Sequence, residues 1–311
     1  MIQIKYGLID NNIDITDIVF SKMTKNNISF IPKNDVERAN MFSDPLLNIL
    51  KSVFIINDKH VISNYDHTTN IYIDIANYTI YTDDVPEYIQ HIWPDIHSKL
   101  IKIQNNLKIE FGSFNDEFPE QLMATRYLTG NEKVLEIGGN IGRNSLIIGY
   151  ILNQNQNSNF VTLECDSGIS KQLIYNRDIN NLNFFIENSA LSKRNLIQKD
   201  WDTIVSDELL PGYKHVNTIT LEALYNKYNI EFDTLVLDCE GAFYYILMDM
   251  PEILQNVNLI IIENDFKELS HKQYVDSILT QHNFIVDYSE TLTTASWAPI
   301  CSKNFFEVWK K

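Results

Sequence analysis

Cysteine is scarce in this chain of 311 residues, which contains three: Cys165, Cys239 and Cys301. They lie far apart in the sequence, so they form none of the closely spaced pairs that are typical of zinc or iron–sulfur sites. An odd number of widely separated cysteines also argues against a disulfide framework. We therefore expect a reduced, cytoplasmic protein, and the sequence predicts no metal site.

Long hydrophobic runs are also missing. The longest apolar stretches, such as LIIGYIL at 146–152, are far shorter than the roughly 18 residues that a membrane-spanning helix needs. The opening segment, MIQIKYGLID, has neither a basic start nor a hydrophobic centre, so it does not resemble a signal peptide. We expect no membrane among the partners of this protein.

Basic residues are few relative to acidic ones. The sequence has 41 Asp and Glu against 25 Lys and Arg, a formal net charge of −16. Affinity for nucleic-acid backbones is built on clustered Lys and Arg, so this balance disfavours a nucleic-acid partner. Hydrophobic residues make up 44% of the chain, which is ordinary for a globular protein of one large or two modest domains.

Short alternating segments predict β structure in the first part of the chain. Residues 70–82 (NIYIDIANYTIYT) place Ile71, Ile73 and Ile75 on one face, as a half-buried strand does. We predict a small, sandwich-like β domain over 1–83 and a helical connector over 84–113. The β domain carries no recognisable chemistry. Binding of a glycan, binding of a partner protein, and formation of a homodimer are all compatible with its sequence.

The pattern changes to alternating strands and helices over 114–311. Nearly continuous apolar runs predict parallel strands buried on both faces, at 133–138, 159–165, 183–191, 232–240 and 258–265. Pro119 suits the first turn of a helix, and Ser270 with Gln273 predicts a capping box for a later one. The segments 283–290 and 304–310 predict a closing antiparallel hairpin. Together they predict a doubly wound α/β sheet.

Four acidic residues end apolar runs in this second part: Glu136, Glu164, Asp238 and Glu263. A single acid often ends a strand simply because it is solvated there. Ligands of such sheets bind beyond the carboxyl ends of the strands, at the point where the strand order reverses. Four acids at the same edge therefore favour a ligand site.

A glycine-rich turn follows the first of these acids, in VLEIGGNIG at 134–142. A dinucleotide site has the spacing G-x-G-x-x-G and a pyrophosphate at the helix N-terminus. This turn lacks that spacing, and Glu136 would repel a phosphate. A carboxylate favours a cation such as S-adenosylmethionine, and Glu164 can accept the ribose hydroxyls. An NAD-dependent oxidoreductase is the less favoured alternative.

Five segments in a fixed order are similar to the FkbM family of S-adenosylmethionine-dependent O-methyltransferases: VLEIGGNIG, LECD (163–166), NSALS (188–192), TITLEAL (218–224) and LVLDCEGAFYYIL (235–247). The similarity covers roughly residues 114–310. It implies a Rossmann-like class I methyltransferase sheet with S-adenosylmethionine as cofactor. The chain departs from the family pattern at Cys165, where Pro is common, at Leu237, where Lys is frequent, and at Phe243, where an acid is frequent. These departures affect the acceptor side more than the cofactor side.

The resemblance also implies roles for individual residues. Those expected around the cofactor are Glu136, Gly138, Asn140 and Gly142 at the methionine part, Glu164 and Cys165 near the ribose, Ser189 and Ala190 by the adenine, and Asp238 facing the methyl group. Candidate catalytic acids are Asp238, Glu240 and Glu263. Apart from the resemblance, His271 is a less favoured base, and Gln121 and Arg126 could reach the cofactor carboxylate.

The sequence therefore predicts an O-methyltransferase that acts on a sugar hydroxyl, in a nucleotide sugar or a glycan, with deoxyhexoses among the candidates. Methyl transfer is an in-line displacement, so positioning the acceptor oxygen about 3 Å from the methyl carbon supplies much of the acceleration. A base adds roughly 10²–10⁴-fold. The main alternative is a catalytically silent scaffold that binds the cofactor and works through its N-terminal domain.

Overall fold

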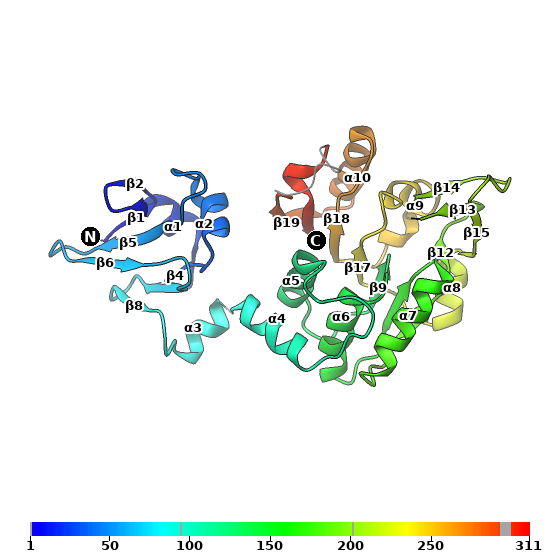
Figure 1. Ribbon diagram of the computed structural model, residues 1–311, viewed down its shortest axis with the longest axis horizontal. Coiled ribbons are helices and arrows are strands. Elements are labelled where there is room, and N and C mark those ends of the chain that lie inside the picture. The colour runs from blue at the N-terminus through cyan, green and yellow to red at the C-terminus, as the bar shows by residue number, and fades with distance from the viewer. Residues whose placement is uncertain (1, 94, 201, 293–299) are drawn as a thin grey trace. The chain divides into compact units, whose positions relative to one another are not determined.

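The computed structural model describes residues 2–93, 95–200, 202–292 and 300–311. The chain forms two compact units, Met1–Asp95 and Ile96–Lys311, each of which is described by itself (Figure 1). The division falls within the segment 84–113. Helix α3 (Glu87–Ile92) belongs to the first unit, and α4 (Ile96–Asn105) begins the second.

The first unit contains two antiparallel four-stranded sheets, with strand orders β2-β1-β5-β6 and β3-β4-β7-β8. The strands are β1 (Gln3–Leu8), β2 (Asn11–Asp14), β3 (Thr24–Lys25), β4 (Ile28–Ile31), β5 (Ser52–Ile56), β6 (Ile62–Tyr65), β7 (Ile71–Asp74) and β8 (Thr79–Tyr81). Ile4 and Ile55 of one sheet share a hydrophobic core with Ile31 and Ile73 of the other. This arrangement confirms the predicted small β domain at the N-terminus.

Two short helices in this unit were not predicted. Helix α1 (Thr16–Lys22) packs Val19 into the shared core, and α2 (Asp35–Phe42) is capped by Asn34, whose side chain accepts a hydrogen bond from the backbone of Val36. Helices of seven or eight residues are marginal in isolation. Their stability comes from packing against the sheets, which local sequence does not reveal.

The second unit is built on a seven-stranded sheet with the order β11-β10-β9-β17-β18-β20-β19. Its strands are β9 (Val134–Ile137), β10 (Phe160–Leu163), β11 (Phe185–Glu187), β17 (Thr234–Leu237), β18 (Leu259–Glu263), β19 (Ile285–Glu290) and β20 (Phe306–Lys310). The first five are parallel, and β20 is antiparallel to both β18 and β19. This is the predicted Rossmann-like, mostly parallel sheet with its closing antiparallel hairpin.

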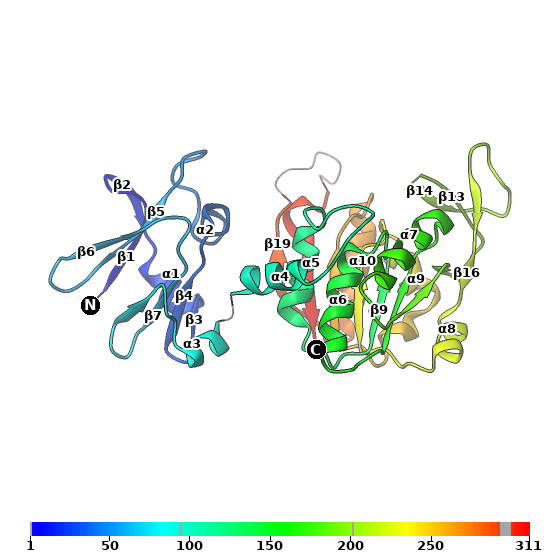
Figure 2. The same cartoon turned by 60° about the horizontal axis from the view of Figure 1, so that its bottom comes forward.

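Helices flank this sheet on both sides (Figure 2). They are α5 (Phe118–Tyr127), α6 (Arg143–Gln154), α7 (Ser167–Asp178), α8 (Leu221–Tyr228), α9 (Phe243–Asp249) and α10 (Leu269–Gln281). The predicted capping box of α10 is wrong. The helix begins one residue before Ser270, whose hydroxyl donates to the Glu268 carboxylate at 3.2 Å instead of capping the backbone.

The segment 183–191 was predicted as one strand but divides in two. Its second half, β12 (Ala190–Leu191), leaves the main sheet and pairs with β16 (Thr218–Ile219). Between them lies a small antiparallel sheet that the sequence did not predict, formed by β13 (Leu196–Lys199), β14 (Asp202–Val205) and β15 (Lys214–Val216). Figure 2 shows β13 and β14 at the same edge of the unit as the loop before α5.

The burial of the strands in the core of the second unit explains why they could be predicted from the sequence. Every side chain of β9, β10 and β17 is buried, so these strands are continuously apolar apart from Glu136, Thr162 and Thr234.

Among the residues that the structure describes, no helix has both the length and the hydrophobicity to cross a lipid bilayer.

Candidate active site

The reversal of strand order lies between β9 and β17, which are adjacent and lead to opposite halves of the sheet. The backbone N–H of Asp238 donates to the carbonyl of Ile137 at 3.1 Å. Gly138 has φ +96°, and a Cβ added there would lie 1.6 Å from the Asp238 carbonyl oxygen. Only glycine fits this crossing of backbones. A crevice at such a reversal is the usual ligand site of these sheets.

The turn from β9 to α6 has a left-handed backbone at two further predicted positions. Asn140 has φ +47° and Gly142 has φ +96°. A Cβ on Gly142 would lie 2.3 Å from the Leu173 side chain of α7. The turn is therefore packed closely against α7, and α6 begins directly after Gly142.

Glu136 lies beneath this turn. It is 2% exposed and accepts a hydrogen bond from the Ser145 hydroxyl of α6. Burial is the main cause that raises its pKa to about 7, and the nearby Glu117 and Glu164 add to the effect, while hydrogen bonds from Ser145 and Thr162 oppose it. The carboxyl group thus secures the start of α6, and its predicted contact with the methionine part of a cofactor stays a prediction.

Glu164 joins the glycine turn to the loop after β10. One of its carboxylate oxygens accepts from the backbone N–H of Asn140 at 2.9 Å, and the other from that of Asp166 at 2.7 Å. Burial raises the pKa of Glu164. The side-chain amide of Asn188 donates to the Glu164 carbonyl at 2.7 Å. The structure therefore brings together the ends of β9, β10 and β11, as the sequence predicted.

The remaining residues predicted near the ribose and adenine are neutral and firmly held. Burial raises the pKa of the Cys165 thiol to about 11, so the thiol is protonated at neutral pH. The Ser189 hydroxyl donates to Glu187 at 3.1 Å, and the backbone N–H of Ala190 donates to the Asn217 carbonyl at 2.8 Å. These contacts fix the backbone of the segment that follows β11.

Asp238 stands at the end of β17 with a half-buried carboxylate. Among the described residues this carboxylate has no hydrogen-bond partner. Burial, followed by the charges of Glu117 and Glu120, raises its pKa well above the ordinary value. An unsatisfied acid at the reversal point is a group to which a cation or a hydroxyl can bind.

Glu263, at the end of β18, forms a hydrogen bond with Glu120 of α5. Two carboxyl groups can share a hydrogen bond only when one of them is protonated. Burial is the main cause that raises the pKa of each. The raised pKa values therefore favour a protonated carboxyl group in this pair. Glu120 was not among the predicted site residues, because nothing in its local sequence places α5 beside β18.

Glu240 points outward, unlike the other predicted catalytic acids. It is exposed and has φ +52°. Burial is the main cause that raises its pKa, the charge of Lys267 opposes this effect, and the charge of Asp202 adds to it. Below it, Asp265 accepts a hydrogen bond from the backbone of Gly241 at 2.6 Å, and burial together with Glu240 raises the pKa of Asp265 to about 7.

Arg143 is a basic residue at this edge that sequence reasoning missed. Its Nη1 lies 2.6 Å from the Glu117 carboxylate, which also accepts from the side chain of Asn140 at 3.2 Å. Its Nε is buried without a hydrogen-bond partner. Arg143 directly follows the glycine turn and is the first residue of α6. Because helix N-termini attract ligand carboxylates, a basic residue at this position could have been recognised from the sequence as a candidate site residue.

Two less favoured candidates are engaged elsewhere. The Gln121 amide is buried and donates to the carbonyls of Phe114, Asp116 and Glu117, so it holds the loop before α5. The His271 ring stacks on Tyr244, with ring centroids 3.8 Å apart. Within the described part of the chain, no group of three or more His, Cys, Asp or Glu residues is arranged to hold a metal ion.

The chain matches no family model, and no curated protein matches it in sequence. Solved structures give low similarities. An O-methyltransferase from Bacillus cereus in complex with S-adenosylhomocysteine is 14% identical, with a TM-score of 0.39, over 72% of this chain and 96% of that one. Sp1610 of Streptococcus pneumoniae, a candidate tRNA (m1A22) methyltransferase, is 13% identical, with a TM-score of 0.39, over 60% and 67%.

A protein of the NADB-Rossmann superfamily from Streptococcus agalactiae is 15% identical, with a TM-score of 0.38, over 61% of this chain and 67% of that one. All three likenesses are too weak for function to be transferred from them. The assignment of the fold therefore depends on the strand order and strand directions described above.

Proposed function

We propose that this protein is an S-adenosylmethionine-dependent O-methyltransferase that methylates a sugar hydroxyl in a nucleotide sugar or a glycan. The observation that carries this proposal is the unpartnered carboxylate of Asp238, the residue whose backbone carbonyl lies against Gly138 at the reversal of strand order. Acids from three neighbouring elements lie around it, and a cation is the ligand that such a site favours.

The residues at this edge fit S-adenosylmethionine. The Glu164 carboxylate accepts two hydrogen bonds and has room for about two more, which the ribose hydroxyls can supply. Asp238 would face the positively charged part of the cofactor. The buried, unpartnered Nε of Arg143 is a donor that suits the cofactor carboxylate. When bound, the cofactor supplies the methyl group.

The carboxyl groups can manage the proton that the acceptor hydroxyl loses. In the proposed mechanism Asp238 orients the hydroxyl, and the pair Glu263–Glu120 accepts and shares its proton. Glu240, which is exposed, is assigned to the acceptor side, away from this pair. Positioning supplies most of the acceleration, and proton removal adds roughly 10²–10⁴-fold.

The negative charge of the residues at the site supports an acceptor group that is itself uncharged. Acids crowd the site, and Arg143, the basic residue described there, is already paired with Glu117. A phosphate next to the methyl group would be repelled, which with the net charge of −16 disfavours a nucleic-acid acceptor. All three cysteines are free, which supports a role in the reducing cytoplasm.

Calorimetric titration with S-adenosylmethionine, S-adenosylhomocysteine and NAD tests the cofactor. We expect the first two to bind and NAD not to bind, and selective binding of NAD would overturn the proposal. Mass spectrometry for a methyl gain across nucleotide sugars, deoxyhexose glycans, lipids, small hydroxyl compounds and tRNA then tests the acceptor. Methylation of tRNA alone would overturn the sugar assignment.

The substitution Asp238→Ala tests the catalytic assignment. We expect it to reduce methyl transfer by at least about 10²-fold, whereas Asp178→Asn, at an exposed acid of α7, serves as a control that leaves transfer unchanged. A wild-type protein that binds the cofactor but methylates no member of the panel would favour the scaffold alternative.

A further inference from the structure

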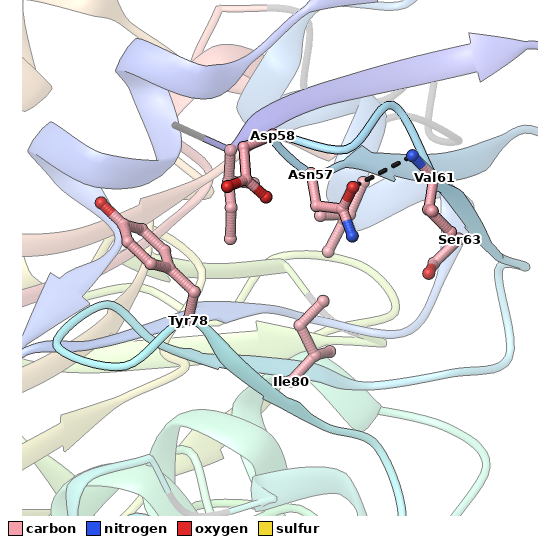
Figure 3. Close-up of a pocket in the computed structure, with 8 residues that line it drawn as sticks. Asn57, Asp58, Val61, Ser63, Tyr78 and Ile80 are labelled. Carbon is pink, nitrogen blue, oxygen red and sulfur yellow. Dashed lines mark hydrogen bonds between the residues drawn. The ribbon is translucent and has the colours of Figure 1, made fainter.

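The first unit contains a small hollow of about 170 Å³ at an end of its two-sheet core (Figure 3). Its floor is apolar and comes from both sheets. Ile55 of β5 and Ile2, which directly precedes β1, are 2% and 6% exposed, and Ile80 of β8 in the other sheet lines the hollow with them. The hollow therefore lies where the hydrophobic core reaches the surface.

The hollow exists because a small polar residue occupies an inner-face position. Ile4, Ile55 and Ser63 lie opposite one another in register across β1, β5 and β6, so their side chains share one face of the sheet. Ile4 and Ile55 are buried in the core. Ser63 ends this row and leaves open the volume that a third large apolar side chain would fill.

Polar groups from the turn between β5 and β6 cover one side of the hollow. The side-chain oxygen of Asn57 accepts from the backbone of Lys59 and Val61, each at 3.0 Å. Its amide nitrogen is left directed into the hollow (Figure 3). The neighbouring Asp58 carboxylate has no hydrogen bond or ion pair with any described residue. Both groups are available to a ligand.

An aromatic ring stands across from Asp58. Tyr78 lies in the turn between β7 and β8, is 53% exposed and has φ +57°. A bulky residue in this backbone region costs about 1–3 kcal/mol, and such strain is concentrated at binding positions. A turn of this kind usually has glycine or asparagine there. The Tyr78 ring lies at the rim of the hollow (Figure 3).

We propose that this hollow binds a single ring of a neutral sugar. A sugar ring has an apolar C–H face, which suits the isoleucine floor and the Tyr78 ring, and an edge of hydroxyl groups. Those hydroxyls can donate to the Asp58 carboxylate and accept from the Asn57 amide. No lysine or arginine is among the residues that line the hollow, so a phosphorylated or carboxylated sugar is disfavoured. The site requires no cofactor and is independent of the proposed methyl transfer.

Ligand-observed NMR and calorimetry on the full chain test this site without added cofactor. The probes are methyl glycosides of glucose, galactose, fucose and rhamnose, with glucosamine and glucose 6-phosphate as charged comparisons. We expect at least one neutral glycoside to bind with a dissociation constant of about 1 mM. Asp58→Asn should weaken binding about fivefold or more, and Ser63→Leu, which fills the hollow, should abolish it.

Asp10→Asn is the matched control, because it removes an exposed acid of the same unit outside the hollow, and it should leave binding unchanged. Thermal unfolding shows whether each variant is folded, and Asp58→Asn keeps the test valid if Ser63→Leu is not. Three results would each overturn the proposal: no glycoside binds, binding survives both substitutions, or a charged sugar is preferred.

Discussion

At the scale of single residues, the candidate site is organised by one close contact between backbone segments and by a group of buried or half-buried carboxyl groups. Gly138 allows the turn after β9 to press against the Asp238 carbonyl. Around this contact, burial raises the pKa of Glu136, Glu263 and Asp238. Each raised pKa means that burial disfavours the charged carboxylate. A bound cation would favour the carboxylate and lower its pKa again.

Substitution of Gly138 by alanine should destabilise the protein severely. The added Cβ has no space beside the Asp238 carbonyl, and the positive φ is unfavourable for alanine. We expect a loss of about 2–4 kcal/mol in the free energy of unfolding, measured by urea denaturation. Gly168→Ala is the control, because its nearest neighbour is a side-chain oxygen at 3.1 Å. Equal losses for the two variants would contradict the close contact.

The pair Glu263–Glu120 should make stability depend on pH. Its raised pKa means that the folded state binds a proton more tightly than the unfolded state, so stability present at low pH is lost as the pH rises above the ordinary carboxyl range. Glu263→Gln should therefore be more stable than wild type by roughly 1 kcal/mol at pH 8 and similar at pH 5.

Unfolding by urea at the two pH values measures this difference. Glu222→Gln, an acid in the first turn of α8, serves as the control and should follow wild type at both pH values. Parallel behaviour of Glu263→Gln and wild type would show that the pair does not hold an extra proton.

The sequence identified the acids at strand ends because each directly follows a continuous apolar run. Glu136, Glu164, Asp238 and Glu263 were all located in this way, and the structure places them at one edge of the sheet. Glu120 and Arg143 escaped notice because their proximity to these acids depends on how α5 and α6 pack. No local pattern carries that information.

At the scale of elements, the small sheet β13–β15 is attached to both sides of the candidate site. Lys214 of β15 forms an ion pair with Asp166, which caps α7 after Glu164. Asp202 of β14 accepts from Lys267, which follows Asp265, at 2.9 Å. The sheet thus bridges the loop after β10 and the loop after β18.

Loss of both bridges should weaken cofactor binding in a salt-dependent way. The pairs are exposed, and each contributes at most about 1 kcal/mol. We expect Lys214→Ala combined with Lys267→Ala to reduce the affinity for S-adenosylmethionine about three- to tenfold at low salt, and less at 0.5 M NaCl (about 4 Å screening length). Calorimetry at the two salt concentrations measures this change. The control is Lys171→Ala on α7, and an equal effect there would contradict the bridging role.

Elements with long apolar runs were predicted well, and short elements were not. Strands β9, β10, β17 and β18 are buried on both faces, so their sequences differ sharply from the surrounding helices and turns. Helices α1 and α2 and the sheet β13–β15 are short and expose much of their surface. Packing against neighbouring elements defines them, and a single sequence does not show that packing.

At the scale of the whole molecule, the two units have separate hydrophobic cores. The clusters of the first unit lie within residues 2–93, and the cluster of the second lies within residues 100–309. Every residue that we assign to the cofactor site is in the second unit. The sugar-binding hollow that we propose is entirely in the first.

A chain reduced to residues 96–311 should fold and keep its affinity for S-adenosylmethionine within about threefold, because this unit has its own hydrophobic core and holds every residue assigned to the cofactor site. Calorimetry and thermal unfolding of this fragment test the expectation. The full chain is the reference. A fragment that fails to fold, or that binds more than about tenfold more weakly, would show that the first unit supports the site.

Separate cores also have a consequence for how this protein can change over evolutionary time. A substitution that alters packing in one unit needs no compensating substitution in the other. The two halves are thus free to diverge at different rates, and recombination near position 95 could join the unit that holds the candidate site to a different N-terminal domain without disturbing its interior.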